Sequence, residues 1–116
     1  MAELQQIIQQ AGPLPISATA TIETDAPTAV TLAGSVWTGS PNCTIGVALS
    51  IDGMEVAAAS IFSNGPDTHR AVVPVTFPYT FATGPKGPEP HSFELTALTP
   101  ETTSDYNDFF SVSVLY

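Results

Sequence analysis

The chain has 116 residues, a net charge of −9 and only two strong cations, Arg70 and Lys86. That length is typical of one domain, and a 43% share of hydrophobic residues is enough to build a core. Because nucleic acids and anionic membrane surfaces are bound through several cations, the composition argues against both as partners. Charged residues make up only 11% of the chain, so we expect neutral surface regions that could become contacts between subunits.

The first residues, MAELQQIIQQ, lack the basic start and the apolar run of a signal peptide. No stretch approaches the roughly 20 apolar residues of a membrane span. Cys43 has no second cysteine to pair with, which suits a reducing compartment. The sequence therefore predicts a cytoplasmic protein, or one released without a signal peptide.

Residues 1–12 predict a short helical arm in front of a single domain over residues 13–116. Leu4, Ile7 and Ile8 recur at helical spacing among glutamines, and Gly12 would end a helix. A helix of one or two turns is unstable alone, so we expect it to pack on the domain or on a neighbouring subunit.

From residue 16 onward apolar and polar residues alternate, which predicts strands over 16–23 and about 29–37. Gly34, inside the second of these, indicates a bulge or the close approach of another backbone.

The dipeptide Asp52-Gly53 suits the two-residue turn of a hairpin, which would join strands over 44–51 and 54–62. Counting outward from the turn predicts three facing apolar pairs: Ile51 with Met54, Leu49 with Val56, and Val47 with Ala58.

Further strands are expected over 69–77, 91–98 and 108–116, with a short extended piece over 79–82. Pro74 lacks an amide donor, so the strand that contains it should be an edge strand or a bulged one. We expect the last strand to lie inside a sheet. Seven or eight strands with regular turn signals predict an all-β fold, an antiparallel β-sandwich or jelly roll.

The segment SDYNDFF, residues 104–110, is the first candidate site. Asp105, Asn107 and Asp108 could offer three oxygens to calcium, with further ligands from Asp67 or Asp25. The same residue types also favour turns, and a turn before the last strand is the interpretation we prefer. We expect no cofactor.

A sugar site would combine hydrogen-bonding side chains with an aromatic ring. Residues 105–108 offer such a combination, with Tyr106 as the ring. Trp37 and Asn42 offer a second one. The alternative role for Trp37 is to cover the core. His69 and His91 could bind zinc together, but their spacing does not indicate a site. Because no nucleophile elbow or phosphate-binding loop is present, we expect no enzymatic activity.

The segments HSFELTAL and DFFSVSVLY resemble the closing strands of small jelly-roll domains of the tumour-necrosis-factor-like kind. This resemblance implies a homo-oligomeric ring, often a trimer, that binds sugars or protein receptors through its loops.

Two functions follow as hypotheses. The preferred one is an oligomeric, non-catalytic, lectin-like module that binds glycans through its loops. The alternative is a structural or assembly subunit of a shell, fibre or particle.

Overall fold

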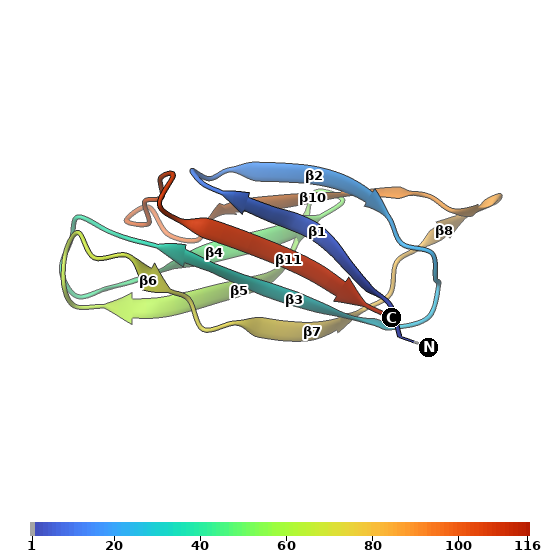
Figure 1. Cartoon of the computed structure of the whole chain (residues 1–116), viewed down its shortest axis with the longest axis horizontal. Helices are drawn as coiled ribbons and strands as arrows, with labels where there is room; N and C mark the ends of the chain where they lie inside the picture. Colours follow the sequence, from blue (N-terminus) through green and yellow to red (C-terminus); the bar gives the residue numbers. More distant parts are fainter. Residues whose placement is uncertain (1) are drawn as a thin grey trace.

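The computed structural model describes residues 2–116, which form antiparallel strands and no helix (Figure 1). The all-β prediction is therefore confirmed. None of the described residues belongs to a helix long and apolar enough to cross a membrane. The strands are β1 Leu4–Ala11, β2 Ile16–Thr21, β3 Thr28–Val36, β4 Cys43–Ile51, β5 Met54–Ser63, β6 Arg70–Ala71, β7 Val75–Tyr79, β8 Thr83–Gly84, β9 Gly87–Pro88, β10 Pro90–Ala97 and β11 Phe109–Leu115.

Two sheets lie against each other along the 50 Å length of the molecule (Figure 1). The first sheet has the order β1-β11-β3, with β7 and the short β6 both pairing with β3. The second sheet has the order β2-β10-β4-β5, and β8 and β9 form a small separate hairpin. As expected, the last strand lies inside a sheet, between β1 and β3.

The predicted N-terminal helix is wrong: residues 4–11 form strand β1, which pairs with β11. (Residue 1 of the predicted arm lies outside the described residues.) The pairing shifts between Gln6 and Ile8, so Ile7 is an extra residue in the strand. Such a bulge interrupts the two-residue period and places apolar residues at positions 4, 7 and 8, a spacing that imitates a helix.

The Asp52-Gly53 hairpin is confirmed, and Asp52 and Gly53 both have positive φ, at 54° and 82°. Its predicted register holds only beside the turn, where Ile51 faces Met54. Beyond a bulge at Val56, Leu49 faces Ala57 and Val47 faces Ala59, one residue later than expected. Because one extra residue reverses the faces of a strand, the bulge turns Ala59 toward the core and leaves Ala58, which the predicted register had placed on the core face, exposed.

The inward side chains of both sheets form one apolar core. In β11 the buried residues are Phe110, Val112 and Val114, and every second position between them is more exposed. Gly34 faces Phe110, and a side chain at this position would meet the Phe110 ring at 2.5 Å. The nearest approach at Gly34 is therefore that of an aromatic ring, whereas the sequence had predicted a bulge or another backbone.

The strand predicted over residues 69–77 is divided at residues 72–74. Its first part, β6, pairs with the end of β3, and its second part, β7, pairs with the beginning of β3. Pro74 lies in the interruption, as expected from a residue that cannot donate a ladder hydrogen bond.

Candidate functional site

The loop that contains SDYNDFF lies at one end of the two sheets, together with the connections β3–β4 and β5–β6 (Figure 1). Strands β3 and β11 are neighbours, so their adjoining loops are held close together. Trp37 starts one of these loops and pairs by backbone hydrogen bonds with Thr103 in another. His69, at the end of the β5–β6 connection, completes the group.

Asp108 is the centre of this loop cluster, and it is fully buried. Its Oδ1 accepts hydrogen bonds from the Ser35 hydroxyl at 2.9 Å and from His69 Nδ1 at 2.7 Å. Its Oδ2 accepts the Asp105 amide at 2.9 Å, and its backbone oxygen accepts the Gly12 amide at 2.8 Å. The carboxylate thus joins β3, the β5–β6 connection and its own loop, and the Asp108 backbone adds the segment at Gly12. The three hydrogen bonds to the carboxylate offset the cost of burying it.

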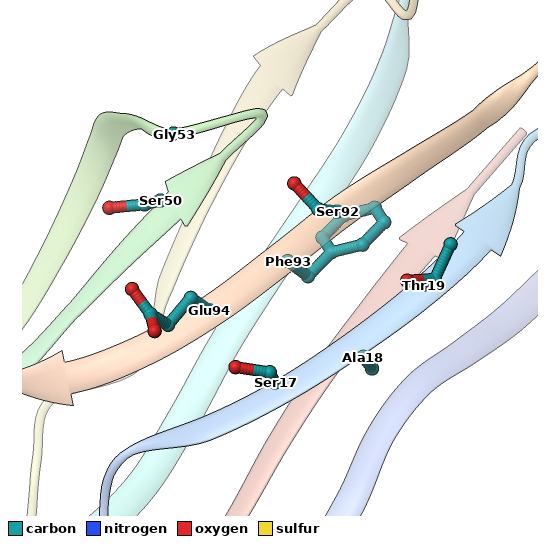
Figure 2. A pocket seen from close by; sticks show the side chains of 8 residues that line it. All are labelled: Ser17, Ala18, Thr19, Ser50, Gly53, Ser92, Phe93 and Glu94. Carbon is teal, nitrogen blue, oxygen red and sulfur yellow. The ribbon is translucent and has the colours of Figure 1, made fainter.

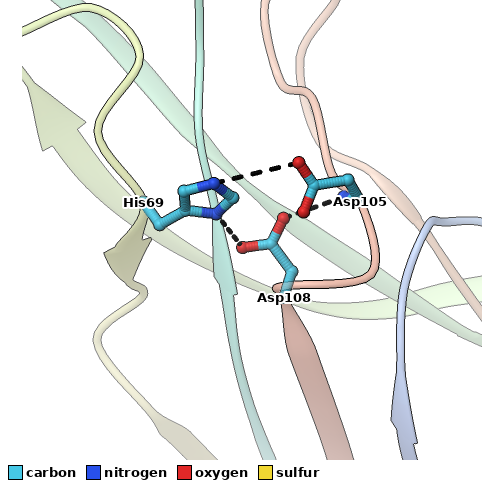
Figure 3. Close-up of side chains that lie close together, drawn as sticks. All are labelled: His69, Asp105 and Asp108. Atoms are coloured by element: carbon cyan, nitrogen blue, oxygen red, sulfur yellow. Dashed lines mark hydrogen bonds and ion pairs between the residues drawn. The ribbon is translucent and has the colours of Figure 1, made fainter.

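His69 lies between two carboxylates and is itself exposed (Figure 3). The hydrogen bond to Asp108 raises the pKa of His69 above its ordinary 6.5, partial desolvation opposes this, and the charges of Asp108 and Asp105 add to it. The Nε2 atom lies 3.9 Å from Asp105 Oδ2, which is too long for a hydrogen bond. The ring also lies against Trp37, with 5.8 Å between the ring centroids.

Ligand atoms of His69, Asp105 and Asp108 lie within 4.8 Å of one another, the spacing of a small metal site. Both oxygens of Asp108 already accept hydrogen bonds, however, and Asp105 Oδ1 accepts the Asn107 amide at 2.8 Å. His69 Nε2 and Asp105 Oδ2 are then the atoms left for a cation. Structural zinc usually needs four ligands and calcium six to eight, so the cluster acts first as a clamp between loops.

The same contacts do not form a nucleophile–base–carboxylate chain. Ser35 donates to Asp108 and not to His69, so no hydroxyl is activated by the imidazole in the way that a triad requires.

The other residues of the predicted sugar site have different degrees of exposure. Tyr106 is 82% exposed at the tip of the loop, next to exposed Asn107. Trp37 is half-buried, and its Nε1 is buried without a hydrogen-bond partner among residues 2–116. Asn42 is exposed in the β3–β4 connection with φ of 53°. The structure thus brings Trp37 next to the 104–108 loop, through its backbone pairing with Thr103 and its ring contact with His69.

A second histidine–aspartate pair fixes the β4–β5 turn to β10. His91, 5% exposed, faces Asp52 Oδ2 through Nδ1 at 2.6 Å and the Ala82 carbonyl through Nε2 at 2.9 Å. Both ring nitrogens face acceptors, so the ring can donate to both when it is protonated. Burial opposes ionisation of Asp52, but the hydrogen bonds from His91 and Ser92, together with the His91 charge, outweigh it and lower the pKa of Asp52 below 3.8.

Next to this fixed turn, the outer face of the second sheet has a hollow of about 240 Å³ (Figure 2). Its rim carries the hydroxyls of Ser17, Thr19 and Ser50 and the carboxylate of Glu94. In residues 2–116 these four side chains form no hydrogen bond or ion pair with other residues. The remaining lining comes from Ala18, Gly53, Ser92 and Phe93.

Sequence reasoning missed this hollow. The polar positions of β2, β4 and β10 were recognised as outward-facing, but their combination depends on which strands are neighbours. The pairing of Glu94 with Ser17 on one side and with Ser50 on the other creates the site.

The chain matches no protein-family model, and no curated protein is significantly similar to it.

Proposed function

We propose that the chain is a non-catalytic recognition module that binds a polyhydroxylated ligand, such as a single carbohydrate unit, in the hollow of the second sheet. The observation that carries this proposal is the free rim: three hydroxyls and one carboxylate point outward without partners in the described part of the chain. Such groups can exchange their bonds to water for bonds to ligand hydroxyls.

The size and chemistry of the hollow define the ligand further. Its volume of about 240 Å³ is below the roughly 300–1,000 Å³ of sites for drug-sized ligands, which suits one sugar ring. Phe93 lines it but is only 1% exposed, so it offers little aromatic surface for stacking. The expected affinity is therefore weak, and useful binding would depend on repeated sites.

Glu94 sets the charge preference of the hollow. The two strong cations of the chain, Arg70 and Lys86, lie outside the hollow, so the carboxylate would repel an anionic sugar. Neutral sugars and amino sugars fit, because they can donate hydrogen bonds to Glu94 and the hydroxyls.

The strand order supports the finer description of the fold as a jelly roll. If β1–β5, β7, β10 and β11 are numbered one to eight, the sheets read 1-8-3-6 and 2-7-4-5. This order supports a jelly roll, an architecture of eight strands in two sheets whose members include lectin and capsid domains. It fits the predicted resemblance to tumour-necrosis-factor-like domains, although a fold by itself does not determine a function.

The test is a titration of the protein with neutral, amino and anionic monosaccharides, in which binding is detected through the NMR chemical shifts of the backbone amides. We expect neutral and amino sugars to shift the amides of β2, β4 and β10 around the hollow. Glu94→Gln should weaken amino-sugar binding by about tenfold, the loss of one charge-assisted hydrogen bond, and should reduce the discrimination against anionic sugars.

The matched control is Glu55→Gln. Glu55 is an exposed carboxylate of the same sheet that does not line the hollow, so this variant should bind as the unmodified chain does. If no sugar shifts these amides, or if the shifts occur around Tyr106 and Trp37, the hollow is not the binding site.

A further inference from the structure

The outward side chains of the four long strands of the first sheet are all uncharged. These strands, β1, β3, β7 and β11, contain neither acids nor strong cations, although the chain as a whole carries −9. The acids lie instead at Glu3, just before β1, in the connections between strands, and on the second sheet at Glu55 and Glu94.

The strand register arranges this face, which we call the neutral face, in four rows that run across the strands. The rows are Leu4–Leu115–Ala29–Pro78, Gln6–Ser113–Thr31–Thr76, Gln9–Ser111–Ala33 and Ala11–Phe109. The middle rows consist of small or flexible polar side chains. The end rows contain its three exposed large apolar side chains, Leu4 at 58%, Phe109 at 53% and Leu115 at 46%.

We propose that the neutral face binds the neutral face of a second copy of this chain. Two molecules of charge −9 repel each other, and the repulsion is smallest where the facing surfaces contain no acids. A face of small side chains also lets two sheets approach to roughly the 10 Å separation of packed sheets.

The rows are self-complementary under a two-fold axis that lies in the interface, perpendicular to β11 and between Ser111 and Ser113. This axis reverses the order of the rows, so Leu4 and Leu115 of one copy would cover Phe109 of the other. Large apolar side chains then pack at both ends of the interface, as expected for an isologous contact.

The area is sufficient for a specific contact. Four strands about 4.8 Å apart and about eight residues long cover about 500 Å² on each copy. Two such faces bury about 1,000 Å², which is near the lower limit for a specific interface. A dimer of moderate affinity follows, in which the hollows of the two second sheets lie on opposite outer surfaces.

Sedimentation of the full chain at increasing concentration tests this proposal. The mass should rise from 12.1 kDa toward twice that value, and added salt should not weaken the association, because no charge pair holds it. Ser113→Glu places a carboxylate beside the two-fold axis and should return the protein to 12.1 kDa. Thr44→Glu, which adds a carboxylate at an exposed position of the second sheet outside the hollow, should leave the dimer intact.

If Ser113→Glu fails to fold, dilution of the unmodified chain gives the same information. The methyl signals of Ala33 and Leu115 should shift on dilution, and that of Ala18 should remain constant. A monomer at every concentration would overturn the proposal, as would a trimer or another oligomer that Ser113→Glu leaves intact. This outcome is independent of sugar binding, which the hollow variants test separately.

Discussion

The two sheets share one core but have different outer faces. The outward side chains of the four long strands of the first sheet are uncharged and tightly ordered in rows, whereas the second sheet carries Glu55, Glu94 and a hollow with unpartnered hydroxyls. Because alternate residues of a strand face opposite sides, inward residues can build a common core while outward residues differ freely. One fold thus provides a surface suited to self-association and another suited to a small ligand.

The first prediction compares the glycines in the central strands of the two sheets. A side chain at Gly46, in the second sheet, would collide with the backbone of Ala59 and Ser60, whereas one at Gly34 would meet the side chain of Phe110. Backbone in a ladder moves less easily than a ring. We expect Gly46→Ala to lower the free energy of unfolding by about 3 kcal/mol and Gly34→Ala by about 1–2 kcal/mol.

Urea denaturation of both variants measures this difference. An equal loss of stability would mean that the Phe110 ring is held as firmly as the ladder of the second sheet.

The second prediction concerns the turn that borders the hollow. Asp52→Ala removes the carboxylate that faces buried His91 and that accepts the Ser92 amide at 3.0 Å. The loss of charge-assisted hydrogen bonds should destabilise the protein by about 2–3 kcal/mol and weaken sugar binding through the displaced turn. Thermal unfolding measures the loss of stability, and the sugar titration measures the loss of affinity.

Glu55→Ala is the control for that variant. Glu55 lies three residues beyond Asp52 but has no hydrogen bond or ion pair in the described chain, so the expected change is within about 0.5 kcal/mol. If both variants unfold alike, the His91–Asp52 pair does not hold the turn.

The smallest effect is expected at His69, the exposed histidine of the loop clamp. Its pKa is raised in the folded protein, so the folded state binds the proton more tightly than the unfolded state. The resulting stabilisation is complete below pH 6.5, the pKa of His69 in the unfolded chain. It is lost as the pH rises through the higher pKa that His69 has in the folded protein. His69→Gln should remove this decline in melting temperature, and an identical decline in the variant would contradict the assignment.

Alternation and turn residues were sufficient to predict the main strands after residue 16, the Asp52-Gly53 hairpin and the inner position of β11, but not strand β1, which was predicted as a helix. The errors arose at Ile7 and Val56, where one extra residue interrupts the period and no local signal reveals it. The histidine–aspartate pairs could not be predicted either. In each of them the two partners are separated by 39 residues and meet only because loops of different strands converge. The candidate residues at 104–108 were recognised by type, but their partner His69 and the distant hollow required the sheet order.

The pairing of β1 with β11 determines when the first sheet can form during synthesis. Translation proceeds from the N-terminus at roughly 5–20 residues per second, so β1 leaves the ribosome several seconds before β11 exists. During this interval a glutamine-rich, uncharged segment has both of its backbone edges open to other chains. Nascent chains on one messenger RNA would therefore be most vulnerable to mispairing through LQQIIQQA. The arrival of β11 covers one backbone edge of β1, and the other remains the edge of the first sheet.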